Sequence, residues 1–301
     1  MAAINTIGSH KTSFEAIDQQ ISQTLAQSAA RNSGKKKDYS FDRLRMLFCE
    51  PYTVTTNLVI YEPKIGDILK FGEKEFYKIL NIFISHPTQY RVQLWDAGID
   101  WNNITDFELF RSLILGLTPD KTAIIFGDVN FSKFKSVPCD YTDEEKAENE
   151  KLISEGKKPL PVPVILMNEE QDIYIDEKVY DKMAEYLRTL FGIFPKVEKA
   201  KGRTTKISII EEEKMEAVRN EGNSSSFLFP LVSALVNHPG FKYNIEELRN
   251  VGIFQFMDSV NRIRAYEQAS SLNSGAYSGM CDLSKIDKKL FDFMRDLNND
   301  K

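Results

Sequence analysis

The chain has 301 residues, which at about 100–200 residues per domain allows two domains or one elaborate domain. Its hydrophobic fraction of 42% and charged fraction of 28% are typical of folded proteins, and they exclude a chain that is disordered throughout or built from a fibrous repeat. Lys and Arg number 39 against 44 Asp and Glu, and this balance argues against a whole-surface affinity for nucleic acid or anionic membranes.

The cysteines and the N-terminal residues indicate a reducing compartment. The three cysteines are far apart in the sequence and form no CxxC pair, so neither a disulfide framework nor a cysteine zinc site is expected at Cys49, Cys139 and Cys281. The first residues lack the basic stretch and apolar run of a secretory signal, and no segment approaches the roughly 20 apolar residues that cross a bilayer. We therefore expect a cytoplasmic protein without a membrane partner.

The first predicted element is an amphipathic helix. Thr12 and Glu15 have capping-box spacing. Four apolar residues fall on one helical face, and they are our candidate partner-binding residues: Phe14, Ile17, Ile21 and Leu25. Residues 31–37 are polar, with glycine and clustered charge, which predicts a flexible link. Residues 1–38 are therefore expected to be a tethered helix that docks onto its own domain or into a groove of another protein.

Residues 39–195 are predicted to form a mixed α+β domain. Its first part has β-branched and apolar residues at 52–61, which predict a strand. Helical spacing then predicts three segments, the first interrupted at Gly72 and the last capped by Asp106: residues 65–83, 88–97 and 106–117. The interruption is compatible with one kinked helix or with two short ones.

The second part of this domain is predicted to contain a small sheet. Residues 122–137 fit a strand, a short helix or both, and the acidic residues 140–155 fit a solvated loop or an exposed helix. A hairpin is expected within residues 164–175. A helix over residues 177–191 follows, with Asp176 at its cap position.

The C-terminal third is predicted to be helical. Residues 196–206 are basic and poor in apolar groups, so they are expected to be an exposed, mobile linker and a domain boundary. Within the helical domain, residues 207–301, helices are predicted over 207–220, 227–237, 245–250, 253–270 and 285–297. The whole chain is thus predicted to be an α-rich α+β fold, a mixed N-terminal domain with a small sheet followed by a helical C-terminal domain.

No motif in the sequence predicts catalysis. The only histidines are His10, His86 and His238, and the last two precede proline, which favours a turn over a catalytic role. No dinucleotide, P-loop, zincin or EF-hand spacing is present. We therefore predict a non-enzymatic protein with no catalytic residue, no cofactor and no metal site.

Two carboxylate pairs and two basic runs have alternative interpretations. Asp96 with Asp100, and Asp172 with Asp176, are spaced for acid–base chemistry on a helix, but their turn contexts favour capping roles. The basic runs at 35–37 and 196–206 lack interleaved aromatic residues, so we expect linkers and no nucleic-acid partner. Twenty Phe and 12 Tyr give modest weight to a protein-interaction role.

A combination of segments carries a resemblance to a known group of proteins. The segments lie at residues 65–77, 94–101, 125–134, 239–243, 256–260 and 277–280. Together they resemble proteins encoded in the tail-morphogenesis region of phages and prophages of Gram-positive bacteria, a group that is similar to tail assembly chaperones. The resemblance runs from about Tyr52 to the C-terminus.

This resemblance implies a function in protein binding. A member of the group is expected to keep the tape-measure protein soluble in the host cytoplasm while tail-tube subunits polymerise around it. The implied partners are the tape-measure protein or the tail-tube protein, with self-association as a further option. The chain is longer than the small helical tail chaperones, so a structural virion protein of the tail or baseplate is the alternative. A hydrolase or nuclease is the third, and it would need an acidic or histidine-containing pocket.

Overall fold

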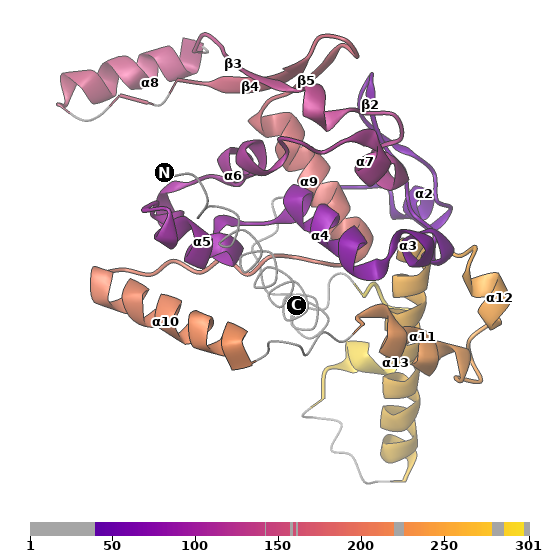
Figure 1. The fold of residues 1–301 in the computed structure, drawn as a ribbon. Coiled ribbons are helices and arrows are strands. Elements are labelled where there is room, and N and C mark those ends of the chain that lie inside the picture. The colour runs from indigo at the N-terminus through magenta and orange to yellow at the C-terminus, as the bar shows by residue number, and fades with distance from the viewer. Residues whose placement is uncertain are drawn as a thin grey trace.

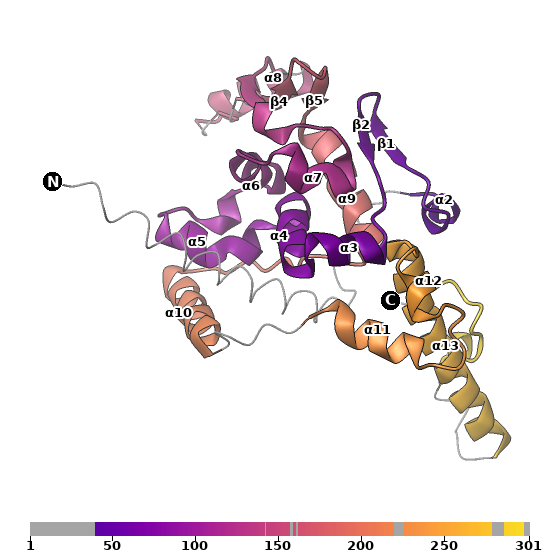
Figure 2. The same ribbon diagram turned by 45° about the vertical axis from the view of Figure 1, so that its right-hand side comes forward.

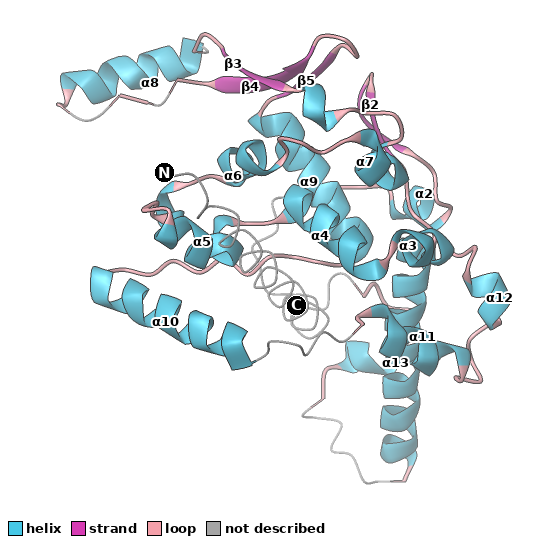
Figure 3. Ribbon diagram, in the orientation of Figure 1, coloured by secondary structure: helices cyan, strands magenta, loops and turns pink. Residues whose placement is uncertain are grey.

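A computed structural model describes residues 40–141, 143–156, 159–160, 162–219, 226–278 and 286–297. The fold is α-rich α+β, as predicted, with two small antiparallel sheets in the N-terminal half and helices in the C-terminal half (Figures 1 and 3). The amphipathic helix predicted within residues 1–38 lies outside the described residues. None of the described helices is both long enough and apolar enough to cross a membrane.

The chain enters the fold through a short helix and a hairpin, which are α2 (Arg43–Leu47), β1 (Tyr52–Thr55) and β2 (Leu58–Ile60). The single strand predicted over residues 52–61 is wrong, because the chain reverses at Thr56 and Asn57. Asparagine favours turns, and the Asn57 amide also donates a hydrogen bond of 3.0 Å to the Asp172 carbonyl. The hairpin is therefore fixed to a distant part of the chain at its tip.

Two helices follow, α3 (Ile65–Phe71) and α4 (Glu73–Ile84). They are separate because Gly72 between them has φ 97°, a conformation that other residues rarely adopt. The second of the two predicted alternatives is thus confirmed. Phe76, Leu80 and Phe83 lie on the buried face of α4, at the spacing of an amphipathic helix.

A series of short helices follows: η1 (Pro87–Tyr90), α5 (Arg91–Asp96), η2 (Trp101–Asn103), α6 (Asp106–Leu113) and α7 (Pro119–Phe126). The predicted cap of α6 is wrong by one residue. Thr105 is the cap, because its hydroxyl accepts from the Glu108 amide at 3.1 Å while the Glu108 carboxylate accepts from the Thr105 amide at 2.9 Å. The helix also ends at Leu113, four residues before the predicted end, and the chain then turns at Gly116, where φ is 94°.

The second sheet has the order β3-β4-β5 and is antiparallel: β3 (Lys135–Pro138), β4 (Val164–Asn168) and β5 (Ile173–Ile175). The predicted hairpin within residues 164–175 is confirmed. Residues 122–137, for which a strand, a short helix or both were predicted, contain the end of α7, the short helix η3 (Phe131–Lys133) and β3. The acidic segment is the exposed helix α8 (Asp143–Ser154), which projects from the ends of β3 and β4 (Figure 1).

The central helix is α9 (Glu177–Phe191), which packs against α4, α6, α13, β1 and β5. Asp176 caps it as predicted, since the Val179 amide donates to the Asp176 carboxylate at 2.7 Å. The helix ends at Gly192 in the left-handed conformation. The side chains of Tyr180 and Leu187 are fully buried, so α9 forms the middle of the core.

The C-terminal elements are α10 (Arg203–Arg219), α11 (Leu228–Val236), α12 (Ile245–Leu248), α13 (Ile253–Tyr277) and η5 (Lys288–Phe291). Two predictions need correction. Helix α13 continues beyond Ser270 through Ser/Gly-rich residues and ends at Tyr277. In this added part the side-chain amide of Asn273 donates to the Ala269 carbonyl of the same helix. The last predicted helix, 285–297, is a single helical turn, because Asp287 and Asp292 bond to nearby backbone amides instead.

One hydrophobic core joins the two halves of the chain. Phe83 and Leu187 belong to the same buried cluster as Phe256 and Val260. The two halves also share backbone hydrogen bonds in a contact that we call the clasp, residues 62–66 against residues 249–254. Its bonds run from Ile65 N to Val251 O at 3.0 Å, from Gly66 N to Arg249 O at 2.9 Å, and from Ile253 N to Pro63 O at 3.1 Å.

Residues 196–202, which we call the strap, run in extended form from the end of α9 toward α10 (Figure 2). They contain most of the predicted linker and are mostly exposed, but Ala200 is buried. The Asn102 amide donates to the Ala200 carbonyl at 2.8 Å, and Glu198 forms an ion pair of 2.8 Å with Arg91. The strap is therefore attached to η2 and α5 along its length.

Candidate functional site

The four candidate partner-binding residues, Phe14, Ile17, Ile21 and Leu25, lie outside the described residues, so their binding role stays a prediction. His10 also lies outside them. Cys281 and the basic run at residues 35–37 lie outside them as well.

The two described histidines have the turn roles that the sequence predicts. His86 accepts a hydrogen bond from the Thr88 amide at 3.1 Å, and His238 accepts one from the Gly240 amide at 3.0 Å. Burial lowers the pKa of His86, so its ring is favoured in the neutral form. The Thr88 hydroxyl lies 2.8 Å from the His86 ring, but Thr88 is buried and its hydroxyl contacts the backbone of Glu198. This arrangement orders a loop and exposes no nucleophile.

Beside His86 lies a buried arginine that the sequence did not single out. The Arg188 guanidinium donates to the Ile84 carbonyl at 2.9 Å and pairs with the Asp106 carboxylate at 2.8 Å. The second carboxylate oxygen of Asp106 lies 3.6 Å from the His86 Nε2. Arg188 thereby connects the end of α4, the start of α6 and the last turn of α9, which makes it a structural residue.

The carboxylates of the first pair each have a lysine partner. Asp96 pairs with Lys214 at 2.7 Å, whereas Asp100 caps η2 and pairs with Lys206. Within the ranges that the structure describes, no group of three His, Cys, Asp or Glu side chains is arranged to hold a metal ion.

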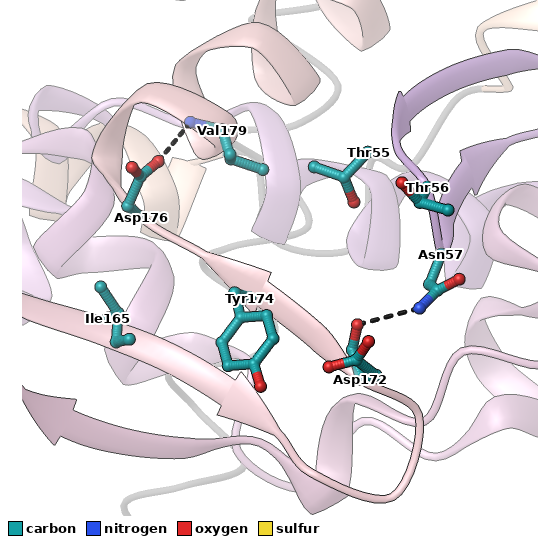
Figure 4. A pocket seen from close by; sticks show the side chains of 8 residues that line it. All are labelled: Thr55, Thr56, Asn57, Ile165, Asp172, Tyr174, Asp176 and Val179. Atoms are coloured by element: carbon teal, nitrogen blue, oxygen red, sulfur yellow. Dashed lines mark hydrogen bonds between the residues drawn. The ribbon is translucent and has the colours of Figure 1, made fainter.

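The second pair, Asp172 and Asp176, lines a pocket of about 590 Å³ between the two sheets and the start of α9 (Figure 4). Its lining comes from the tip of the first hairpin, from β4 and β5, and from the first turn of α9: Thr55, Thr56, Asn57, Ile165, Asp172, Tyr174, Asp176 and Val179. At one end of the pocket the Asn57 amide reaches across to the Asp172 carbonyl, and at the other Asp176 bonds to the Val179 amide. Both aspartates stand out in the sequence but the pocket does not, because the hairpin tip is more than a hundred residues away from them.

The chemistry of this pocket is that of a polar recognition site. Hydrogen bonding to the Asp172 carboxylate raises the pKa of Tyr174, so its phenol stays protonated and can donate. Three hydroxyl groups, one amide and two carboxylates face a space that is open to solvent, with Ile165 and Val179 as its apolar residues. Such a set of groups can bind a polar or cationic group by hydrogen bonds.

A second pocket, of about 390 Å³, lies among the C-terminal helices. It is lined by the α11–α12 connection, α12 and the start of α13: Lys242, Tyr243, Glu247, Asn250, Val251 and Gln255. The Tyr243 hydroxyl accepts from the Gln255 amide at 2.8 Å and so fixes one wall. Ile245, the first residue of α12, lies in the sequence between the lining residues Tyr243 and Glu247, and it is 58% exposed.

The C-terminal segment adds an exposed apolar surface to α13. We call it the η5 patch, consisting of Tyr266, Phe293 and Met294. The rings of Tyr266 and Phe293 meet edge to face at 5.5 Å, and the Met294 side chain is 73% exposed. Arg262 holds this segment on the helix by donating to the Phe293 carbonyl at 2.7 Å. Aromatic and methionine side chains displayed on a fixed backbone are typical of protein-binding surfaces.

An ionisable group also lies in the clasp, at the start of α13. The Glu62 carboxylate accepts from the Phe254 amide at 2.8 Å and takes the place of a cap that Gly252 cannot supply. Burial raises the pKa of Glu62 to about 7, and this effect outweighs the backbone amides, which favour the charged form. Cys49 is in contact with Glu62, and burial raises the pKa of its thiol as well.

This raised pKa predicts a specific pH dependence. The folded state binds a proton at Glu62 between the usual pKa of 4.5 and about 7, whereas the unfolded state does not. The stabilisation is therefore complete below pH 4.5 and is lost as the pH rises through 7. We measure the free energy of unfolding of the wild type and of Glu62→Gln with urea. The wild-type value, relative to that of the variant, should fall by about 1 kcal/mol or more as the pH rises from 4.5 to about 7. A difference that is constant with pH would contradict the assignment.

The sequence offered little signal for the pocket, the η5 patch and Glu62. Each depends on residues that are distant in the chain, such as Glu62 and Phe254, which are 192 positions apart. A partial signal existed for the patch, because Phe293 and Met294 lie within the helix predicted over residues 285–297. In the structure that helix is absent, and both side chains are exposed.

Comparison with known proteins gives one finding. The sequence model of a protein family described as the YomV second domain matches residues 222–298, which contain α11, α12, α13, the second pocket and the η5 patch. This family is phage-derived, and the match supports a phage origin for the protein. No curated protein and no solved structure matches the chain significantly.

Proposed function

We propose that the protein is a non-enzymatic phage tail assembly factor that binds the tape-measure protein or tail-tube subunits in the host cytoplasm. The observation that carries the proposal is the η5 patch, which lies within the residues matched by the phage-derived family. A factor of this kind must bind apolar segments of an unassembled partner and release them later, and exposed aromatic and methionine side chains suit such contacts. The alternative is a structural virion protein of the tail or baseplate.

The fold supports binding in a second way. The η5 patch lies at the middle of α13, where Arg262 bonds to the Phe293 carbonyl, and the last turns of the helix extend away from the rest of the protein (Figure 2). Tyr277 at the end of α13 is 92% exposed. A partner can therefore approach this part of the helix without displacing the core.

The proposal predicts which proteins are captured and which side chains are needed. We expect the tagged protein, isolated from cells that make phage particles, to retain the tape-measure protein or the tail-tube protein. Phe293→Ser with Met294→Ser should lower that recovery about tenfold, because it removes the centre of an apolar contact. Ile17→Asp with Ile21→Asp should also lower it and leave the melting temperature nearly unchanged if the N-terminal helix is a partner-binding element.

Controls separate binding from folding. Leu115→Ser with Leu44→Ser removes two exposed apolar side chains that lie outside the η5 patch, and it should leave the recovery of the phage partner unchanged. Mass spectrometry of purified particles distinguishes the two phage roles, since an assembly factor is absent from particles and a virion protein is present in stoichiometric amounts. If neither sample contains a phage partner, the proposed function is wrong.

A further inference from the structure

Helix α8 stands apart from the body of the protein. It is a 12-residue helix, it extends from β3 and β4, and none of its described side chains is buried (Figures 1 and 2). A hydrogen bond of 2.9 Å from the Leu160 amide to the Asn149 side chain attaches the helix to the returning chain. Isolated helices of this length are only marginally stable in water. Because α8 buries no described side chain against the rest of the protein, packing against a partner would stabilise it.

The charge of α8 selects the kind of partner. Residues 140–155 contain seven Asp and Glu against two Lys. Among the described side chains, Glu148 and Glu150 are exposed, and Ile153 adds an apolar group that is 59% exposed. The surface is therefore an acidic helix with a single apolar contact point, which fits a basic surface that carries an apolar residue.

The strap has these complementary properties. Residues 196–202 contain three Lys against one Glu, and Arg203 follows directly. Lys199 and Lys201 are exposed, and no ion pair within the described residues involves either of them. Val197 between them and the end of α9 is 54% exposed. The contacts of Ala200 and Glu198 with η2 and α5 keep this basic surface in a fixed, extended form.

We propose that α8 of one copy of the chain docks on the strap of a second copy. In a single copy the two surfaces lie at different ends of the molecule, with α8 at the top of Figure 1 and the strap below the body next to α10. A contact between unlike surfaces is heterologous, so each copy keeps a free α8 and a free strap for the next copy, and association continues to a ring or an open chain. This inference does not depend on the proposed phage role.

Sedimentation velocity on the full chain tests the contact. We expect the average mass to rise with protein concentration at low ionic strength, about 0.05 M, and to return to that of the monomer at about 0.5 M, where exposed charges are screened. Glu148→Lys with Glu150→Lys should weaken the association about tenfold or more, and Lys199→Glu with Lys201→Glu should do the same. Circular dichroism of each variant confirms that the fold is retained.

Mixing the two variants gives the decisive result. Over α8 itself, Asp143–Ser154, the first variant has four Lys against three Asp and Glu, so its α8 and its strap are both basic. In the second variant both surfaces are acidic, so each variant alone should remain monomeric. In the mixture the basic α8 of one variant meets the acidic strap of the other, and the reverse pair is also complementary, so association should return. Matched controls with the same charge changes elsewhere, Glu169→Lys with Glu170→Lys and Lys70→Glu with Lys74→Glu, should associate like the wild type.

Three results would overturn the proposal. The first is a wild type that stays monomeric at low ionic strength up to about 100 µM, a concentration at which even weak surface contacts are populated. The second is association that both double variants retain. The third is a mixture that stays monomeric although both variants are folded, which would assign α8 to a basic surface on some other protein.

Discussion

Arg188→Met is expected to lower the free energy of unfolding by about 2–3 kcal/mol, because it leaves a partly buried carboxylate without its cation and removes the hydrogen bonds of the guanidinium. Arg188 is almost fully buried, and its guanidinium pairs with Asp106 and bonds to the Ile84 carbonyl. Methionine fills a similar volume, so the loss reports the charge and the hydrogen bonds. Urea unfolding at neutral pH, followed by circular dichroism, measures it.

Two comparisons make this prediction specific. Arg45→Met removes an exposed arginine whose two ion pairs are both 3.6 Å long, and it should change the free energy by less than about 0.5 kcal/mol. Combining Arg188→Met with Asp106→Asn removes the uncompensated charge, so the double variant should be more stable than the sum of the two single effects predicts. Strict additivity would show that Asp106 and Arg188 do not depend on each other.

Gly66→Ala is expected to destabilise the protein by about 2–3 kcal/mol through a steric conflict within the clasp. A methyl group at this position would lie 2.7 Å from the Arg249 carbonyl oxygen, which is backbone and already accepts the Gly66 amide. Helix propensity alone would favour alanine by about 0.5–1 kcal/mol, so a measured loss shows that the contact outweighs it. Thermal unfolding should show a lower melting temperature.

Lys70→Ala and Gly98→Ala are the matched controls. Lys70 is exposed on the same helix, and alanine there should be close to neutral. Gly98 has open space around it but a φ of 76°, so its substitution measures the cost of backbone strain alone, about 1 kcal/mol. If Gly66→Ala is no worse than Gly98→Ala, the two sides of the clasp can move apart and the clasp is not a tight joint.

The sequence predicted those parts of the fold that depend on local patterns. The amphipathic spacing of α4 and α9 was visible because their buried faces repeat at helical periods, and Asp176 was visible as a cap. The hairpin β1–β2 was missed because β-branched and apolar residues flank the turn on both sides and Asn57 is the one turn-favouring residue between them. The end of α13 was missed because Ser and Gly residues, which usually end a helix, lie within its last turns.

The candidate sites were harder to predict, for a physical reason. The pocket joins Asn57 to Asp172, the η5 patch joins Tyr266 to Phe293, and the strap meets Arg91 and Asn102, so every site depends on contacts between distant residues. Composition and periodicity carry no information about such pairs. They did identify the charge of the strap and of α8, because charge runs are visible without knowledge of the fold.

The clasp has a consequence for how the protein folds during its synthesis. Glu62 and Phe254 are 192 residues apart, so the ribosome must add almost two thirds of the chain before the two sides can meet. At about 5–20 residues per second this takes roughly 10–40 s. During that interval the apolar side chains that Phe256 and Val260 later cover are exposed to solvent. The nascent chain is therefore expected to need protection by molecular chaperones until its C-terminal helices emerge.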